Sequence, residues 1–303
     1  MTTTLAAVGQ ICATACVKAN LDQCVRLVGK AAAGGAKVLF LPEASDYIVP
    51  SAHATLDLAA PQSTSAFVLG LRAAAKQHSV AVHVGIHHAV GGQEATGMVV
   101  NRALYMDADG VVQEAATYDK LHVFDYGSLR ESSTVRPGTR LTAPFDSPVG
   151  RIGSLICFDV RFAETAVALA QPGPTSPWRD RPAQILTYPS AFTLRTGEAH
   201  WETLLRARAI ETQSWVVAAA QVGRHNERRA SYGRSMVVDP WGTVRVRLRG
   251  ASPSSGEGDE GAVGEIGFVE MDMGLTDRVR GQMPLQRRTD VYPECKNVDV
   301  EPS

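Results

Sequence analysis

The chain has 303 residues, of which 45% are hydrophobic, and its 30 lysine and arginine residues are balanced by 31 aspartate and glutamate residues. A chain of this length buries about 75% of its unfolded surface, so it is globular and needs no disulfide or metal to complete its core. Its net charge of -1 argues against a nucleic acid or membrane partner, because many basic side chains would be needed to neutralise the phosphates or lipid head groups. A small molecule is therefore the expected partner.

The first part of the chain alternates short apolar runs with segments of helical periodicity, which predicts the order βαβαβ. The expected strands are residues 6–13, 36–43 and 79–87, and the expected helices are residues 18–34 and 64–78. Two further strands, residues 98–107 and 111–119, flank a turn of Asp, Ala, Asp and Gly. Because these residues tolerate positive φ, a hairpin is expected there.

The second half of the chain repeats this order of elements. Strands are expected at residues 148–159, 183–190 and 215–222, and helices at residues 162–170 and 196–213. A last hairpin is expected over residues 235–248, around an Asp-Pro-Trp-Gly turn. Each half therefore forms a sheet with helices beside it.

This arrangement determines the expected layers. Two sheets with helices on one face each would expose their other apolar faces unless the sheets packed on each other. The sequence therefore predicts an α/β fold with a four-layer αββα sandwich. No linker-like stretch lies near the midpoint, so a single domain is expected over residues 1–303. Polar stretches predict surface loops at 171–182 and 250–260, the second of them mobile, and a C-terminal tail at 289–303.

The N-terminus and the cysteines indicate a cytoplasmic protein. No lysine or arginine precedes Lys18, and the opening apolar residues are interrupted, so a signal peptide is not expected. The longest uninterrupted apolar run, residues 215–220, is far shorter than the ~20 residues that span a bilayer. Five cysteines, three of them at Cys12, Cys16 and Cys24, point to reduced thiols. A mitochondrial form remains open.

Several common site motifs are missing. The chain has no G-x-S-x-G, H-E-x-x-H or C-x-x-C sequence. A G-x-G-x-x-G occurs at residues 256–261, but its acidic residues would repel a pyrophosphate. His83, His87 and His88 lie on one expected strand without a suitable cysteine or carboxylate beside them, so core or rim histidines are favoured over metal ligands. We expect no metal site.

Three reactive side chains follow expected strands, where α/β sheets present their ligands. Glu43 ends an apolar strand, and partial burial would raise its pKa and suit a general base. Lys120 lies between a strand and an aromatic segment. Cys157 lies at a strand-to-helix turn, where the ammonium and the helix end would favour the thiolate. Taken singly, each has a structural alternative, namely an exposed charge, a surface lysine and a buried cysteine. Together they predict acyl transfer at the thiol.

In this order and with these flanks, the three residues resemble the Glu-Lys-Cys triad of the nitrilase superfamily of carbon-nitrogen hydrolases. The segments LFLPEASDY, KLHVFD, LICFDVRF, YPSAFT and TGEAHWETLLRARAIETQ are similar to its Nit branch, and the resemblance spans about residues 5–290. It implies the αββα sandwich and a supporting role for Glu131, for which a loop carboxylate is the alternative. The sequence departs from the family pattern at two places. Ala163 stands where the family commonly has proline, and the loop at 171–182 is longer than is usual in the family.

The resemblance also implies a mechanism without metal or organic cofactor. Glu43 would take the proton of Cys157, and Lys120 with the backbone N–H of Phe158 would stabilise the oxyanion. The acyl group would pass through a thioester on Cys157 before hydrolysis. The implied substrate is the amide of deaminated glutathione, with α-ketoglutaramate or another small amide as alternatives. A non-enzymatic scaffold agrees less well, because no triad residue is missing.

Two further expectations follow from the resemblance. A substrate carboxylate needs a cation, for which Arg161 is the first candidate, with a structural ion pair as its alternative; Thr193 and Arg195 are weaker candidates. A homodimer or larger homo-oligomer is also implied, formed through the helices 162–170 and 196–213. The second of these carries the apolar positions Trp201, Leu204, Leu205 and Ile210.

Overall fold

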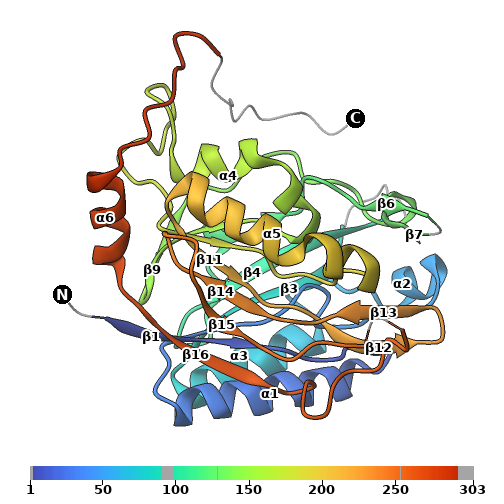
Figure 1. Ribbon diagram of the computed structural model, residues 1–303. Helices are drawn as coiled ribbons and strands as arrows, with labels where there is room; N and C mark the ends of the chain where they lie inside the picture. The colour runs from blue at the N-terminus through green and yellow to red at the C-terminus, as the bar shows by residue number, and fades with distance from the viewer. Residues whose placement is uncertain (1–2, 91–97, 128, 253, 293–303) are drawn as a thin grey trace.

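The computed structural model describes residues 3–90, 98–127, 129–252 and 254–292, which form two six-stranded sheets with helices on their outer sides (Figure 1). The first sheet has the strand order β16-β1-β2-β3-β4-β5. Its strands are β1 (Thr4–Gly9), β2 (Val38–Phe40), β3 (Ala81–Ala89), β4 (Val99–Met106), β5 (Tyr118–Asp119) and β16 (Ile266–Met271). Strands β1, β2 and β3 are parallel, and antiparallel strands complete both edges.

The second sheet has the strand order β15-β14-β11-β10-β9-β8. Its strands are β8 (Phe145–Ser147), β9 (Gly150–Ser154), β10 (Ile185–Thr187), β11 (Trp215–Ala218), β14 (Met236–Val238) and β15 (Val244–Arg247). Again the central strands β9, β10 and β11 are parallel, and the outer strands are antiparallel. The two halves therefore share one plan, as the sequence predicts.

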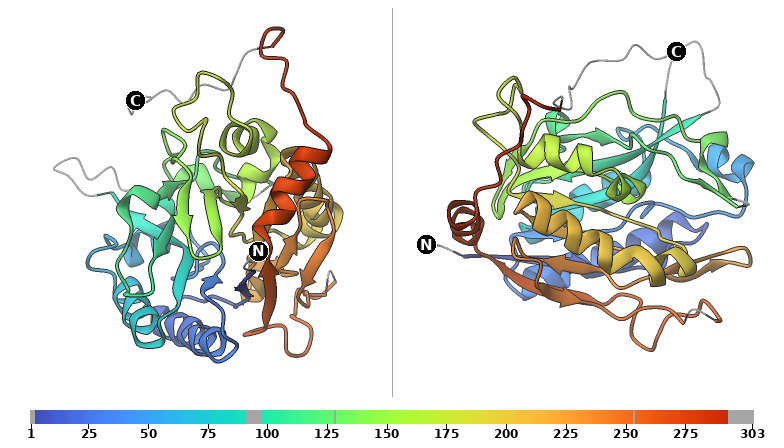
Figure 2. Two further views of the ribbon diagram at one scale, coloured as in Figure 1. Left: turned by 90° about the vertical axis from the view of Figure 1, so that its left-hand side faces the viewer. Right: turned by 45° about the horizontal axis from the view of Figure 1, so that its top comes forward.

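Two pairs of helices cover the outer faces of the sheets (Figures 1 and 2). Helices α1 (Val17–Ala33) and α3 (Ala66–His78) bury an apolar stripe against the first sheet. Helices α4 (Ala163–Ala170) and α5 (Leu194–Thr212) do the same on the second sheet. None of the helices in the described ranges is long and apolar enough to cross a membrane.

A third apolar cluster lies between the two sheets and completes the four-layer αββα sandwich. It joins residues such as Val8 and Phe40 of the first sheet to Ile185 and Trp215 of the second. Because side chains of one strand point alternately to its two faces, Val216 packs instead under the helices of the second sheet. Both faces of each sheet are therefore buried, and the predicted fold class is confirmed.

Smaller elements extend the sandwich at one end. A hairpin of β12 (Val222–Asn226) and β13 (Arg229–Tyr232) and a short ribbon of β6 (Asp125–Tyr126) and β7 (Leu129–Arg130) form separate two-stranded sheets. Helix α2 (Ala52–Leu58) lies at the same end in Figure 1. The 3-10 helices are η1 (Glu114–Ala116), η2 (Glu131–Ser133) and η3 (Cys157–Arg161). Helix α6 (Met273–Gln282) packs across the opposite end.

Part of the strand prediction is wrong. The expected strand at 111–119 is reduced to a bridge between Met106 and Val112, the helix η1 and the two residues of β5. Its Glu-Ala-Ala segment is disfavoured in strands, which explains the 3-10 turn. The prediction also omitted β16 and α6. Strand β16 brings the C-terminal part of the chain back to pair with β1.

The two predicted loops are anchored to the fold. Trp178 of the loop 171–182 is buried and donates a hydrogen bond from Nε1 to the Ala168 carbonyl at 2.7 Å. In the loop 250–260, Ala251 packs on Val222, and the Gly250 N–H donates to Asp259 at 3.2 Å. The described residues of this second loop therefore contact the body of the protein, and its mobility stays a prediction. The tail at 289–303 is described only to residue 292.

Gly85 of β3 lets the segment after β2 approach closely. Its N–H donates to the Pro42 carbonyl at 3.0 Å, and its carbonyl accepts from Ser45 at 2.9 Å. A Cβ at this position would lie 2.6 Å from the Cα of Glu43. Only glycine therefore permits the observed path of the chain at Glu43.

We predict that Gly85→Ala lowers the free energy of unfolding by about 1–3 kcal/mol, because the added methyl group displaces the backbone at Glu43. The measurement is urea unfolding followed by circular dichroism. Gly281→Ala in α6 is the matched control, since its Cβ meets no atom within 4 Å and alanine favours a helix. Equal stability of the two variants would show that the contact at Gly85 is not limiting.

Candidate functional site

Residues from both sheets converge at the carboxyl ends of their strands. Glu43 lies three residues after β2, Lys120 directly follows the edge strand β5, and Cys157 begins η3, three residues after the end of β9. All three are buried, with exposed fractions of 4% for Glu43, 2% for Lys120 and 8% for Cys157. The structure therefore brings together the three residues that the sequence analysis selected.

The carboxylate of Glu43 is fixed from three directions. Its Oε1 accepts hydrogen bonds from Lys120 Nζ at 2.9 Å and from Asn101 Nδ2 at 2.6 Å, and its Oε2 accepts from the Ala191 N–H at 2.9 Å. Gln221, beyond β11, donates to the Glu43 carbonyl at 2.9 Å. Side chain and backbone are thus both held in place.

The ammonium of Lys120 lies between two carboxylates. Besides Glu43, it donates to Glu131 Oε1 at 3.0 Å and Oε2 at 2.9 Å. Glu131 Oε2 also accepts from the Phe124 N–H at 2.6 Å, which ties Glu131 to the segment that follows Lys120. The single positive charge of Lys120 is therefore shared by two carboxylates. When Glu43, Lys120 and Glu131 are all ionised, the three side chains together carry a net negative charge.

Asn101 of β4 is a site residue that the sequence analysis missed. Its Nδ2 donates to Glu43 at 2.6 Å and to Glu131 at 3.1 Å, and its carbonyl accepts from the Lys120 N–H at 2.9 Å. Its Oδ1 is buried and has no hydrogen-bond partner among the described residues. Because an unsatisfied buried acceptor is costly, the side chain is held there for its two donor bonds. The sequence did contain a signal for this residue, because Asn101 is an uncharged polar residue within an otherwise largely apolar strand.

The backbone at Cys157 turns sharply. Cys157 has φ of +44°, which is uncommon for a residue other than glycine and concentrates at functional sites. Its N–H donates to the Pro189 carbonyl at 3.0 Å, so that N–H is already engaged. The expected helix after the thiol begins as the 3-10 helix η3, and α4 starts only at Ala163.

Asp159 joins the cysteine loop to the lysine loop. This fully buried carboxylate accepts from the Ile156 N–H at 2.9 Å and from Tyr118 Oη at 2.7 Å. It also binds the N–H of His122 at 3.1 Å and its Nδ1 at 2.7 Å. The residues on both sides of Lys120 and the residue before Cys157 therefore share one anchor.

The electrostatics of Glu43 differ from the sequence-based expectation. Burial by itself raises the pKa of Glu43, but the charge and hydrogen bond of Lys120 outweigh burial, and the net pKa is lowered. In turn, burial lowers the pKa of Lys120, but Glu131 and Glu43 raise it well above its usual value. Glu43 is therefore an ionised base, and the expectation of a raised pKa is wrong.

The expected thiolate is also corrected. Burial and then the Glu43 carboxylate raise the pKa of Cys157, and these effects exceed the lowering by Lys120 and by the Ala191 N–H. The resting sulfur is thus a thiol, with its proton next to an ionised carboxylate. Such a pair favours proton transfer during attack rather than a thiolate formed in advance.

These residues lie in a cavity of about 290 Å³. Its walls include Ala52 and Thr55 of α2, His87 of β3 and the turn of the β12–β13 hairpin. Three arginines line it as well, namely Arg130, Arg228 and Arg229. None of the three was predicted from the sequence, although Arg228 and Arg229 stand next to each other in it.

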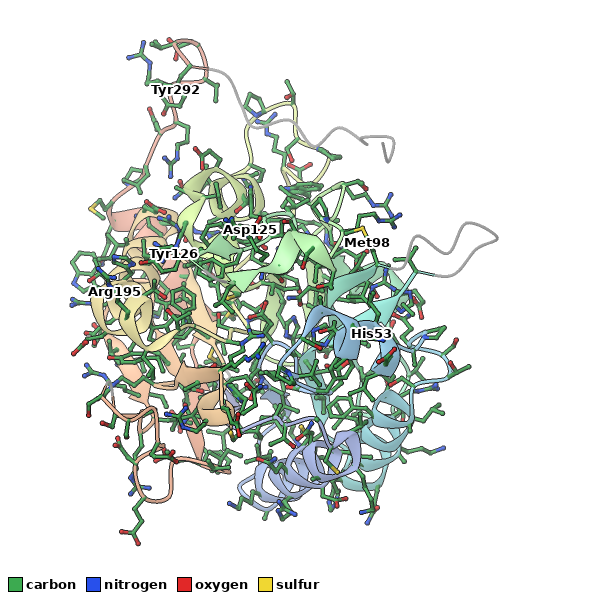
Figure 3. All side chains as sticks on the ribbon, turned by 90° about the vertical axis from the view of Figure 1, so that its right-hand side faces the viewer. His53, Met98, Asp125, Tyr126, Arg195 and Tyr292 are labelled. Carbon is green, nitrogen blue, oxygen red and sulfur yellow. The ribbon has the colours of Figure 1, made fainter. Side chains whose placement is uncertain are left out.

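Among the described residues, the expected substrate-binding side chains are not part of the cavity lining, although the backbone of Phe158 directly follows Cys157. Arg161 donates toward His200 Nδ1 at 3.1 Å and packs over the rings of Phe158 and Phe192. Thr193 caps α5 by accepting from the Thr196 N–H at 3.3 Å. Arg195 lies at the start of α5, across the molecule from His53 of α2 in Figure 3. None of Phe158, Arg161, Thr193 and Arg195 is among the described residues that line the cavity.

The histidines of β3 each have a structural partner. Burial lowers the pKa of His83 to about 3, and its Nε2 lies 3.0 Å from Ser154 Oγ of the second sheet. His87 Nδ1 lies 3.0 Å from Asp46, and His88 Nδ1 accepts from the Gln62 N–H at 3.0 Å. Within the described ranges, no group of three His, Cys, Asp or Glu side chains is arranged to hold a metal ion.

Known proteins are similar in sequence to this chain over most of its length. A family model described as carbon-nitrogen hydrolase matches residues 5–275. The chain is 40% identical over 296 residues to a probable hydrolase nit2 of Schizosaccharomyces pombe, with 96% of this chain and 99% of that protein covered. It is 41% identical over 302 residues to deaminated glutathione amidase of Homo sapiens, with 95% and 83% covered.

Solved structures agree with these matches. The NitFhit protein of C. elegans superposes with a TM-score of 0.80 at 37% identity, covering 96% of this chain and 66% of that one. Nit3 of Saccharomyces cerevisiae, a member of branch 10 of the nitrilase superfamily, superposes with a TM-score of 0.76 at 26% identity, covering 94% and 96%. The chain therefore belongs to the carbon-nitrogen hydrolase family, within the Nit branch of the nitrilase superfamily.

Proposed function

We propose that the protein is an amidase that hydrolyses deaminated glutathione to α-ketoglutarate and cysteinylglycine. The observation that carries the proposal is a thiol, Cys157, buried in a cavity beside the ionised carboxylate of Glu43, which is itself bonded to Lys120. The substrate is suggested by relatives at about 40% identity that bear the name deaminated glutathione amidase.

In the proposed first half-reaction, Cys157 Sγ attacks the amide carbonyl while Glu43 takes the thiol proton. The positive charge of Lys120 and the N–H of Phe158 stabilise the oxyanion. Phe158 is the suitable backbone donor because the N–H of Cys157 is bonded to Pro189. Glu43 then gives its proton to the departing nitrogen, which leaves as an amine. The acyl group remains on Cys157 as a thioester.

In the second half-reaction, water attacks the thioester while Glu43 takes a proton from it. When the tetrahedral intermediate collapses, the carbon–sulfur bond breaks and the proton returns to the sulfur. The acid leaves and the thiol is regenerated. Lys120, held by Glu131, stays charged throughout because its pKa is raised well above its usual value.

The experiment that tests the substrate compares two amides with the same acyl group. We expect kcat/KM to be higher for deaminated glutathione than for α-ketoglutaramate, whose leaving group is ammonia. The opposite order would indicate an omega-amidase. Absence of turnover with both would contradict the proposed substrate class.

We predict that Glu43→Gln and Lys120→Ala each lower kcat by several orders of magnitude, because each removes a group that acts in the same transition state. The double variant should lose little more than the single variants, since neither residue works without the other. Steady-state kinetics of all three variants measure this. Multiplicative losses would show that the two residues act independently.

Asn101 gives a prediction about pH. Its Nδ2 donates to Glu43, and a hydrogen bond to a carboxylate stabilises the charged form. Asn101→Ala should therefore raise the pKa of Glu43, and the acid limb of kcat/KM should move to higher pH. The pH profile measures the shift, and thermal unfolding provides the control. A lower stability with an unmoved acid limb would leave Asn101 only a packing role.

We also propose a cytoplasmic homodimer or larger homo-oligomer. Trp201 and Leu205 of α5 are buried in the chain's own core and cannot contribute, but Ile210, which lies against Gly242, is 44% exposed, and Trp241, the residue before Gly242, is 60% exposed. The segment 283–292 extends from α6 past the loop 171–182, with Tyr292 far from the body of the molecule (Figures 2 and 3). A segment that extends in this way can pack on a neighbouring subunit.

Light scattering at micromolar concentration should therefore give at least twice the chain mass of 32.4 kDa. Replacing both Ile210 and Trp241 with glutamate should weaken the assembly, because two charges would be buried in an apolar contact. A monomeric mass for the unaltered protein would refute the proposal.

A further inference from the structure

The rim of the cavity carries more positive charge than the catalytic group needs. Four positively charged side chains line the cavity, Lys120, Arg130, Arg228 and Arg229, against two negatively charged ones, Glu43 and Glu131. Lys120 lies between the two glutamates, so the three arginines have no carboxylate of the catalytic group left to pair with. The excess charge is therefore available to a ligand.

The three arginines differ in their surroundings. Arg130 lies opposite Asp125 in the β6–β7 ribbon. The hydrogen bonds of Ser132 lower the pKa of Asp125, burial opposes them, and the charge of Arg130 adds a smaller lowering effect. In the described parts of the chain, the side chains of Arg228 and Arg229 form neither an ion pair nor a hydrogen bond. Arg228 is exposed and Arg229 is half-buried, so both guanidinium groups can meet an anion that enters the cavity.

The hairpin that carries Arg228 and Arg229 is held firmly. His225 of β12 binds Ser231 of β13 at 2.8 Å and the Ala13 carbonyl at 2.8 Å. The N–H of Tyr232 donates to the Phe192 carbonyl at 2.9 Å. The turn is thus fixed relative to Ala191, which binds Glu43. A fixed turn keeps the arginines at a constant position on the cavity wall.

The position of Arg229 relates it to the leaving group. Glu43 passes its proton to the departing nitrogen, so the leaving amine lies on the Glu43 side of the thiol. Burial raises the pKa of Glu43 and Lys120 lowers it most strongly, but the charge of Arg229 also reaches this carboxylate and lowers it. Arg229 and Glu43 also line the same cavity, so Arg229 borders the space that the leaving amine occupies.

We propose that Arg228 and Arg229 bind a carboxylate on the leaving amine of the substrate, so that the enzyme selects amides with an acidic leaving group over primary amides. The inference rests on the proposed amidase function. It assigns specificity to a pair of residues on the β12–β13 turn rather than to Arg161. The two arginines also offset the net negative charge of Glu43, Lys120 and Glu131, which by itself would repel an anionic substrate.

The test uses glycine and glycinamide amides of the same acid, which differ only in the carboxylate of the leaving amine. Arg229→Gln, Arg228→Gln and the double variant should lower kcat/KM for the glycine amide by roughly ten- to a hundred-fold. The glycinamide amide should lose much less, because for it only the effect of Arg229 on the Glu43 carboxylate is removed. Arg229→Lys should keep part of the preference. Arg245→Gln on β15 is the control, because it removes an exposed guanidinium outside the cavity.

A second readout does not depend on turnover. In the Cys157→Ala background, calorimetry should show tighter binding of the glycine amide, and Arg229→Gln should abolish that difference. Equal losses for both amides, or no preference in the unaltered protein, would overturn the inference. If the unaltered protein hydrolyses neither amide, the amidase proposal fails, and the binding experiment still decides whether the arginines recognise the carboxylate.

Discussion

The buried ammonium of Lys120 is the interaction on which the site depends. It holds two carboxylates, Glu43 at 2.9 Å and Glu131 at 2.9 Å, that would repel each other in its absence. Burying three charged groups is unfavourable unless each is paired and hydrogen-bonded. Asn101 and the N–H groups of Ala191 and Phe124 supply the remaining bonds. The same pairing keeps Glu43 ionised and leaves Cys157 protonated, which defines the direction of proton transfer.

The sandwich brings these groups together because both sheets end at the same side of the molecule. Glu43, Asn101 and Lys120 come from the first sheet, and Cys157 and Ala191 come from the second. The apolar layer between the sheets, with Phe40 and Trp215, therefore fixes the distance between base and nucleophile. A substitution that shifts this layer would slow catalysis, although it changes none of the reacting atoms.

The sequence predicted the parts of the molecule that depend on local pattern. The alternating and apolar strands, the helices around them and the residues at strand ends were recognisable, so Glu43, Lys120 and Cys157 were found. Contacts between segments that are distant in the sequence were not recognisable. Strand β16 pairs with β1 although most of the chain separates them, and the pairing register of β4 places Asn101 beside its partners. The pKa directions depend on the balance between burial and partners, which a sequence does not show.

In the proposed mechanism, Cys157 carries the acyl group while Glu43 and Lys120 act on it. Rapid quenching during turnover, followed by mass spectrometry of the digested protein, tests this most directly. We predict a mass increase equal to the acyl group on the peptide that contains Cys157, and its loss when turnover ends. An adduct on Cys12, Cys16 or Cys24 instead, or turnover that persists in Cys157→Ala, would contradict the claim.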